Sequence, residues 1–420
     1  MRGTGQREKY LTHRVQRYMF AGHMRINRRR FVISLSLCTA ACGDATGTSG
    51  VVTLCPQATW AAIQREGQPW QAIAVTRASY PLGAGERIGL ERIRGTAESP
   101  DSLQIYYVTT EQARATFSCD TPPTGVSWSK ELHGTVRGIG TLDTDSLAPP
   151  GRAAITVGIR SATVGETQDD FTVSNIQSGT SDLVAAAFNV GRSTIIRRGV
   201  DYPDGSTIPV LDFGSSEAFG LQANTVSVTG NANNYISWQA KNEIITKGGT
   251  LGMLNVQYLA RPATTSAIYS VPANKLLDGE LNSLTVALGL SRVTVYYRVP
   301  SDRALEAGPL ANLPTITSAG TGSDLDTRID EESQPEYGSQ ITLYFYPPSG
   351  VTRPVIIASK EYFGGTPVRW SFTLPDFRGV GDFPFNFDSV WSSASMGLEV
   401  TDRPYLAQPH DGVIYRSSVR

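Results

Sequence analysis

Histidine and cysteine are scarce in this sequence, with four of each among 420 residues. Beyond residue 41 the histidines are His133 and His410. Histidine is the side chain whose ordinary pKa, about 6.5, best suits proton transfer near neutral pH. His133 stands beside an expected strand and His410 in a Pro/Asp/Gly turn. We therefore expect exposed histidines at both positions and no histidine-based catalysis.

The common catalytic motifs are also missing. The sequence has no G-x-S-x-G, no H-E-x-x-H, no Walker A motif, and no G-x-G-x-x-G between a strand and a helix. We therefore predict a protein that is not an enzyme and takes no cofactor. The alternative is a secreted carbohydrate-active hydrolase that uses a pair of carboxylates. The acids available for such a pair are Asp169, Asp170, Glu331, Glu332, Asp376, Asp382 and Asp388.

Long apolar runs are absent, so the sequence predicts no transmembrane helix, which needs about 20 apolar residues. Residues 31–37 form a short apolar stretch, and the small residues Thr39, Ala40 and Ala41 directly precede Cys42. The basic residues ahead of this stretch are Arg25, Arg28, Arg29 and Arg30. Residues 1–41 therefore read as an upstream extension followed by a signal peptide, with either Met1 or Met24 as the start.

This pattern resembles a bacterial lipoprotein signal, in which the cysteine at the cleavage site receives a lipid and becomes the new N-terminus. The resemblance implies export, lipidation (palmitate-type) of Cys42 and attachment to a membrane through that lipid. Gly43 follows the cysteine where an aspartate would retain the protein in the inner membrane, which favours the outer membrane. The alternative is an ordinary secretory signal that is cleaved nearby.

Positive charge is low once this segment is removed. Residues 1–41 contain nine of the 37 basic residues and one of the 38 acidic ones, so 28 and 37 remain and the net charge is about −9. Proteins that bind nucleic acid usually carry clustered Lys and Arg on one face. Nucleic acid is therefore not expected as a partner.

Two cysteines remain in the expected mature chain apart from Cys42. They are Cys55 and Cys119, and neither belongs to a CxxC pair. Two lone cysteines in an oxidising compartment predict one disulfide rather than a zinc or redox site. Closing a loop of this length stabilises a fold by about 4 kcal/mol in the chain-entropy model.

Alternating apolar and polar residues dominate the chain after a small, glycine-rich tether at 42–50. The segments contain four to nine residues, are rich in Val, Ile, Thr and aromatics, and end at Gly, Pro, Asn or Asp. This pattern predicts an all-β fold of two to three β-sandwich-like modules. Helical periodicity competes with this strand pattern only at 109–116, 183–188 and 275–281. We expect a disulfide-containing module at 51–124, a sandwich at 126–230 and a C-terminal β region at 231–420, which the stretch 315–338 would divide into two subdomains.

The middle module contains residues that resemble a known family. HGTVRGIG at 133–140, AAITVGIR at 153–160 and FTVSNIQSGTSDLVAAAF at 171–188 together resemble carboxypeptidase-regulatory-like, transthyretin-type β-sandwich domains over about residues 131–190. The resemblance implies a non-catalytic accessory or spacer module. The whole chain also resembles uncharacterised bacterial surface lipoproteins.

Aromatic side chains supply possible contacts for a glycan or protein ligand. Because successive side chains of a strand take opposite faces, one tyrosine of each pair Tyr106-Tyr107 and Tyr296-Tyr297 is expected to face outward. Most of the six tryptophans are expected in the core. They are Trp60, Trp70, Trp128, Trp238, Trp370 and Trp391.

An acidic stretch at 323–338 offers oxygen ligands of the kind that calcium takes, with Asp324, Asp326 and Asp330 as candidates. An EF-hand loop needs a further ligand and a glycine where Arg328 and Ile329 stand. We therefore predict a solvated acidic loop and no metal site. Together these features predict a lipid-anchored protein of the cell envelope with a non-catalytic binding, adhesion or structural role.

Overall fold

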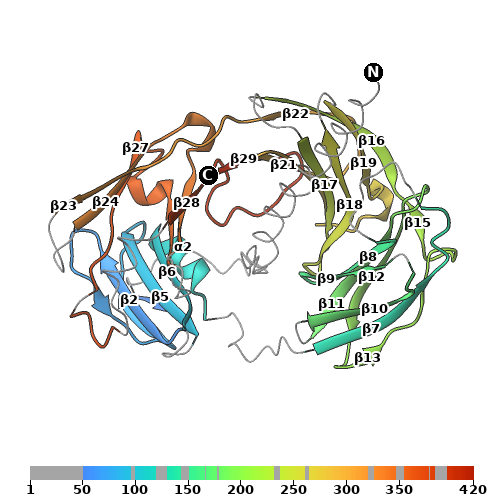
Figure 1. Ribbon diagram of the computed structural model, residues 1–420. Helices are drawn as coiled ribbons and strands as arrows, with labels where there is room; N and C mark the ends of the chain where they lie inside the picture. The colour runs from blue at the N-terminus through green and yellow to red at the C-terminus, as the bar shows by residue number, and fades with distance from the viewer. Residues whose placement is uncertain are drawn as a thin grey trace, which may run out of the picture. The chain divides into compact units, whose positions relative to one another are not determined.

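The computed structural model confirms the all-β prediction (Figure 1). All of the residues that it describes belong to one compact unit, Gly47–Arg420. The short α-helix α2 (Thr110–Thr116) occupies the first of the three stretches where helical periodicity competed, and its N-terminus has a capping box formed by Thr109 and Gln112. The described residues are 51–95, 100–119, 130–142, 151–165, 167–176, 179–230, 237–260, 264–319, 326–346, 354–377, 379–383 and 395–420.

A 12-stranded sheet runs through most of the described chain, in the order β18-β17-β20-β21-β29-β28-β25-β26-β6-β5-β2-β3. Its strands are β2 (Trp60–Arg65), β3 (Gln71–Ala72), β5 (Arg87–Gly95), β6 (Pro100–Thr109), β17 (Ser237–Ile245), β18 (Leu251–Ala260), β20 (Leu281–Leu288), β21 (Ser291–Tyr297), β25 (Gln340–Tyr346), β26 (Pro354–Ser359), β28 (Ser395–Thr401) and β29 (Ile414–Val419).

Segments far apart in the sequence meet in this sheet. β6 pairs in parallel with β26, so strands of the predicted module 51–124 continue directly into strands of the predicted region 231–420. β29 lies between β21 and β28 and joins the two halves of the sheet. Figure 1 shows the blue strands β2 and β5 close to the orange strands β24 and β27.

The N-terminal part of the large sheet is covered on both faces. A three-stranded sheet encloses one apolar core, in which Trp60, Ile105, Ile329 and Phe372 lie buried. The opposite face packs against α2 and a two-stranded sheet around Leu90 and other apolar side chains. The covering strands are β23 (Thr315–Ala319), β24 (Asp326–Glu332), β27 (Arg369–Thr373), β1 (Val51–Leu54) and β4 (Ala78–Pro81).

The middle of the chain forms a sandwich of its own. Its two sheets have the orders β10-β7-β13, with β14 also on β7, and β15-β12-β11-β8-β9. Their facing sides share one core that includes Leu132, Phe171 and Leu183. The strands are β7 (Lys130–Arg137), β8 (Ala153–Val157), β9 (Arg160–Val164), β10 (Asp170–Ile176), β11 (Thr180–Ala187), β12 (Ser193–Asp201), β13 (Ser206–Thr207), β14 (Leu211–Asp212) and β15 (Phe219–Gly220).

β11 occupies the stretch at 183–188 where a helical pattern competed. All of its residues from Leu183 to Ala187 are buried, because one face packs in the sandwich core and the other against Ile244 and Leu254 of the large sheet. A strand buried on both faces loses its alternation and becomes a continuous apolar run. That is why its sequence resembled a helix.

A third core lies between the other end of the large sheet and a sheet of order β19-β16-β22. Val226, Trp238 and Leu284 are buried there. The remaining elements are β16 (Gln222–Gly230), β19 (Thr265–Ser270), β22 (Arg303–Ala307) and the short 3-10 helices η1 (Ala273–Lys275), η3 (Pro335–Tyr337) and η4 (Lys360–Phe363). η1 ends at Lys275, so the stretch 275–281, where helical periodicity also competed, contains no further helix and leads into β20.

Candidate functional site

The predicted cysteine pair meets at the edge of the N-terminal part. Cys55, just after β1, and Cys119, just after α2, are bonded, and their Cα atoms lie 5.1 Å apart. The backbone N–H of Cys55 donates to the carbonyl of Phe117 at 2.8 Å, which holds the two segments side by side. This agrees with the pairing predicted from the cysteine count. Cys42 lies outside the described residues.

Both histidines occupy exposed positions. On β7, the Nδ1 atom of His133 lies 3.0 Å from the hydroxyl of Thr172, and its Nε2 atom lies 3.9 Å from the carboxylate of Glu131. The second distance exceeds a hydrogen bond, so these three residues do not form a connected catalytic triad. His410 lies in a turn, with Nδ1 3.3 Å from the carbonyl of Gln408.

The acids proposed for a hydrolase differ in burial and in the side chains that they contact. Glu331 points into the core from β24, whereas Glu332 is exposed on the opposite face. Asp169 pairs with Arg152, and Asp170 accepts a hydrogen bond of 2.9 Å from Thr135. Asp376 and Asp382 are both exposed, and Asp388 lies outside the described residues. Within the described chain, no shifted carboxyl pKa has a second carboxylate among its causes.

The predicted calcium candidates are not brought together. Asp326 begins β24, and Asp324 lies outside the described residues. A hydrogen bond from Ser371 and the neighbouring Arg328, whose Nε atom lies 2.9 Å from the carboxylate, lower the pKa of Asp330. In the part of the chain that the structure describes, no group of three or more His, Cys, Asp and Glu residues could hold a metal ion.

A polar groove of about 670 Å³ lies on the middle sandwich where β7, β9 and β10 meet. Hydroxyl groups and two carboxylates dominate its lining, and the phenyl ring of Phe171 is buried beneath it. Arg152 already neutralises one of the carboxylates, that of Asp169. The lining residues are Thr135, Ala162, Thr163, Thr167, Gln168, Asp169, Asp170, Phe171 and Thr172.

The tyrosine pairs differ from the sequence prediction. Tyr106 and Tyr107 point to opposite faces of β6, yet they are only 5% and 6% exposed because both faces of the sheet are covered at this point. Tyr297 is buried in the third core, and Tyr296 is buried against Ile245. The expectation that one tyrosine of each pair faces outward is therefore wrong. Trp60, Trp238 and Trp370 are buried, as expected.

Two buried acids lie on the walls of the core enclosed by β23, β24 and β27. Glu331 is 2% exposed, and burial raises the pKa of its carboxyl to about 8. Glu91 on β5 is 1% exposed, and burial raises the pKa of its carboxyl well above its usual range. Among the described residues, neither oxygen of Glu91 has a hydrogen-bond partner.

Glu91 faces a core that contains four neighbouring aromatic side chains, which we name the aromatic box: Trp60, Trp70, Tyr107 and Phe377. Glu91 pairs with Ala62 on one side and Ile105 on the other, both of which belong to the same core. Two residues away on the same face of β5 is Gly89, beside Tyr107 on β6. Trp70 lies directly over Gly89, where an added Cβ would come within 2.8 Å of the indole ring.

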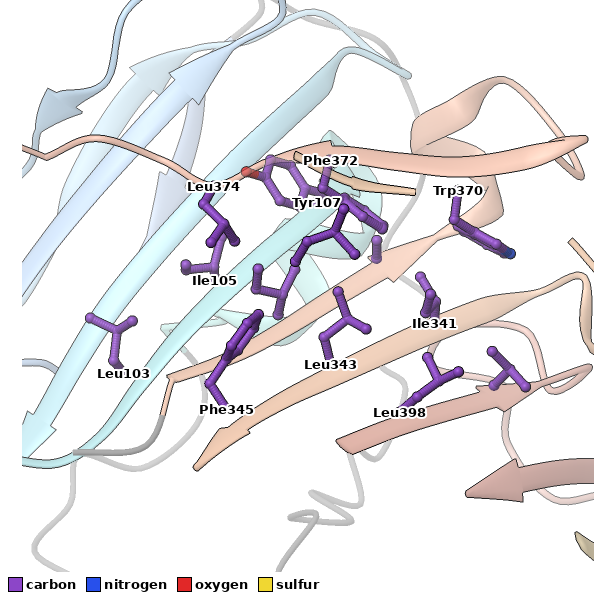
Figure 2. Packing of buried hydrophobic residues seen from close by; sticks show 14 of the residues in the cluster. Leu103, Ile105, Tyr107, Ile341, Leu343, Phe345, Trp370, Phe372, Leu374 and Leu398 are labelled. Atoms are coloured by element: carbon purple, nitrogen blue, oxygen red, sulfur yellow. The ribbon is translucent and has the colours of Figure 1, made fainter. Parts of the chain in front are cut away.

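Phe377 closes the aromatic box. Its ring centroid lies 5.7 Å from that of Trp60 and 5.0 Å from that of Trp70, both in edge-to-face contact. Tyr107 also contacts Phe372 with ring centroids 5.7 Å apart, and Figure 2 shows these two rings beside one another. Sequence reasoning missed Glu91 because Arg92 beside it makes the stretch look solvated. The available clue was Ile93, which shares the face of Glu91.

Comparisons with known proteins add little. The sequence matches no protein-family model, and no curated protein matches it significantly. Among solved structures, the chain is similar to the Bacillus anthracis TIE protein, with 9% sequence identity and a TM-score of 0.14. The match covers 79% of this chain and 62% of that chain, which is less than two thirds of its length.

Proposed function

We propose that this chain is an exported protein of the cell envelope, anchored to the outer membrane by a lipid on Cys42, with a non-catalytic role in binding, adhesion or envelope structure. The observation that carries the proposal is the bond between Cys55 and Cys119, since disulfides persist mainly in oxidising compartments. The basic, apolar and small residues directly ahead of Cys42 support the lipid anchor. No helix in the described residues is long and apolar enough to cross a membrane.

The arrangement of the polar side chains supports a non-catalytic role. The buried acid Glu280 is paired with an arginine, Arg198, at 2.7 Å. His133 and His410 lie on exposed surfaces.

We further propose that the segment around residues 131–190 is the transthyretin-type spacer that its sequence resembles. Its two facing sheets are compatible with such a module. A set of homologous sequences in which the G-x-V pattern of Gly134 and Val136 is not retained would contradict this assignment.

The anchor is tested by replacing Cys42 with Ser in the full-length chain. Release from the membrane fraction and loss of lipid labelling are expected. Cys38→Ser is the matched control, because Cys38 leaves with the signal and its loss should change neither result. If the Cys42→Ser variant stays in the membrane fraction, the proposed anchor is wrong.

A further inference from the structure

Strand β10 of the middle sandwich leaves one of its two edges open. Among the described strands, β10 ends its sheet and pairs only with β7, and β9 ends the facing sheet of the same sandwich (Figure 1). The edge of a sheet presents backbone N–H and C=O groups with which another strand can pair. An open edge beside a groove is therefore a candidate docking site.

The pairing of β10 with β7 shows which backbone groups face the open edge. The N–H of Val136 on β7 donates to the carbonyl of Asp169 at 2.8 Å. In an antiparallel ladder this bond places the next residue, Asp170, opposite Thr135 without a hydrogen bond between their backbones. Because residues alternate in this respect, Asp170 and Thr172 both direct their N–H and C=O groups away from β7.

The polar groove of about 670 Å³ lies against this open edge. β10 lines it with Asp170, Phe171 and Thr172, and β9 lines it with Ala162 and Thr163. A volume of this size falls within the range of about 300–1,000 Å³ that is typical of ligand sites. The groove therefore provides room next to the backbone groups that are open for pairing.

Two arginines tie the ends of β10 to the facing sheet. The Nε atom of Arg152 donates to the carbonyl of Gly165 at 3.1 Å, and its guanidinium pairs with Asp169 just before β10. The Nε atom of Arg160 on β9 donates to the carbonyl of Asn175 near the end of β10 at 3.2 Å. The open edge is thus held in place before any partner arrives, which reduces the entropy lost on binding.

We propose that the open edge of β10 binds an extended, basic peptide segment of another protein, which adds to the sheet as a further strand. Backbone hydrogen bonds supply affinity in this mode of recognition, and side chains supply specificity. The charge of the groove selects a basic segment, since the described residues that line it include two aspartates and no lysine or arginine. This assignment rests on the proposed binding role and deepens it by naming the class of partner.

Asp170 is the residue that reads the positive charge. Its carboxylate accepts one hydrogen bond of 2.9 Å from Thr135, whereas the carboxylate of Asp169 is paired with Arg152. A carboxylate has about four lone pairs, so Asp170 retains acceptors for a lysine or arginine of the added strand.

A small glycan fits the groove less well than a peptide. Sites for small ligands are usually lined by apolar and aromatic side chains, whereas hydroxyl groups and carboxylates dominate here. Phe171 is the aromatic residue of the described lining, and it is only 5% exposed because its ring packs in the sandwich core.

Calorimetric titration of the purified, disulfide-intact protein with short peptides tests this site. The probes are acetylated and amidated hexapeptides of alternating valine and threonine, in which one central residue is lysine, glutamate or unchanged. A fourth probe is the lysine peptide with every backbone nitrogen methylated. We expect the lysine peptide to bind saturably, with a Kd of about 1 mM or less, and about fivefold more tightly than the glutamate peptide. The methylated peptide should not bind, and the amides of Asp170 and Thr172 should exchange hydrogen more slowly in the complex.

Thr172→Pro should abolish peptide binding, because proline removes an N–H at the open edge and leaves the hydrogen bonds between β10 and β7 intact. Thr172→Ala is the matched control: it loses the same hydroxyl, keeps the N–H and should bind within about twofold. Asp170→Asn should weaken binding of the lysine peptide by about threefold. Asp201→Asn, which alters an exposed acid of β12 in the facing sheet, is its control and should have no effect. Far-UV circular dichroism checks that the variants fold.

The proposal is overturned if no peptide binds saturably, if the methylated peptide binds as well as the lysine peptide, or if Thr172→Pro binds as Thr172→Ala does. If Thr172→Pro does not fold, the methylated peptide still decides the question. Sedimentation of the free protein as a dimer that Thr172→Pro abolishes would assign the edge to a second copy of the chain and overturn the proposal. Saturable binding of chitohexaose that Asp170→Asn abolishes would do the same in favour of a glycan. None of these results depends on Cys42, so failure here is distinct from failure of the membrane anchor.

Discussion

Replacing Glu331 by Gln is expected to stabilise the fold near neutral pH and to leave it almost unchanged in acid. The carboxyl of Glu331 is buried, and its pKa in the folded protein is about 8, compared with an ordinary value of 4.5. Between these values the folded protein holds a proton that the unfolded chain releases. The free energy of unfolding therefore falls as pH rises through this window.

The size of the effect follows from the two pKa values. One pKa unit corresponds to about 1.4 kcal/mol, so the acid lowers stability by about 3 kcal/mol at about pH 7 and by about 5 kcal/mol above about pH 8. At about pH 4 the difference vanishes, because Glu331 is then protonated in both states. Glutamine has the shape of the neutral acid and cannot ionise, so the variant loses this dependence.

Urea unfolding followed by tryptophan fluorescence at several pH values measures the difference. Glu332→Gln is the matched control: this neighbour is exposed, and its replacement should change stability by less than about 0.5 kcal/mol at any pH. Other buried acids act equally in all three proteins and cancel. If Glu331→Gln and the unmodified protein lose stability in parallel as pH rises, Glu331 is not protonated in the fold and the reasoning fails.

Three further predictions concern the disulfide, the histidines and the aromatic box. Replacing Cys55 and Cys119 together by Ser should lower the free energy of unfolding by about 4 kcal/mol, and peptide mapping without reductant should recover the two cysteines joined; free thiols at both positions would contradict the bond. In the double variant His133→Ala, His410→Ala, the free energy of unfolding should change by no more than about 0.5 kcal/mol per site. The purified unmodified protein should not turn over esters, peptides or glycosides. A reproducible activity that is lost in the double variant would point to a catalytic histidine. Gly89→Ala should lower the free energy of unfolding by about 1–3 kcal/mol, because its Cβ would lie 2.8 Å from Trp70. Gly83→Ala is the control and should be nearly neutral, because the nearest neighbour of its Cβ would lie at 3.6 Å. Equal effects in both variants would show that Trp70 is loosely held.

The strands could be predicted from the sequence because alternation is a local property. β2 and β10 lie where the alternating pattern placed strands. The partners of the strands could not be predicted. Nothing near Ile105 indicates that it pairs in parallel with Ile356, because that pairing depends on the whole path of the chain between them.

The candidate site shows the same limit. The prediction that a tyrosine at 106 or 107 faces outward assumed a sheet with one open face, and the second covering layer made it wrong. From the sequence alone Glu91 is expected to be exposed to solvent, because nothing near it indicates the sheet that covers it. The disulfide could be predicted because a cysteine count needs no knowledge of tertiary structure.

The parallel pairing of β6 with β26 has a consequence for biosynthesis. Ile105 and Ile356 are partners across 251 positions of the chain, and at typical rates of about 5–20 residues per second a ribosome needs about 10–50 s to make that interval. Throughout this time β6 has an open, apolar edge of the kind that promotes aggregation. A chain kept unfolded by chaperones until all of its strands are available would avoid this exposure, so the strand order itself favours folding after synthesis rather than during it.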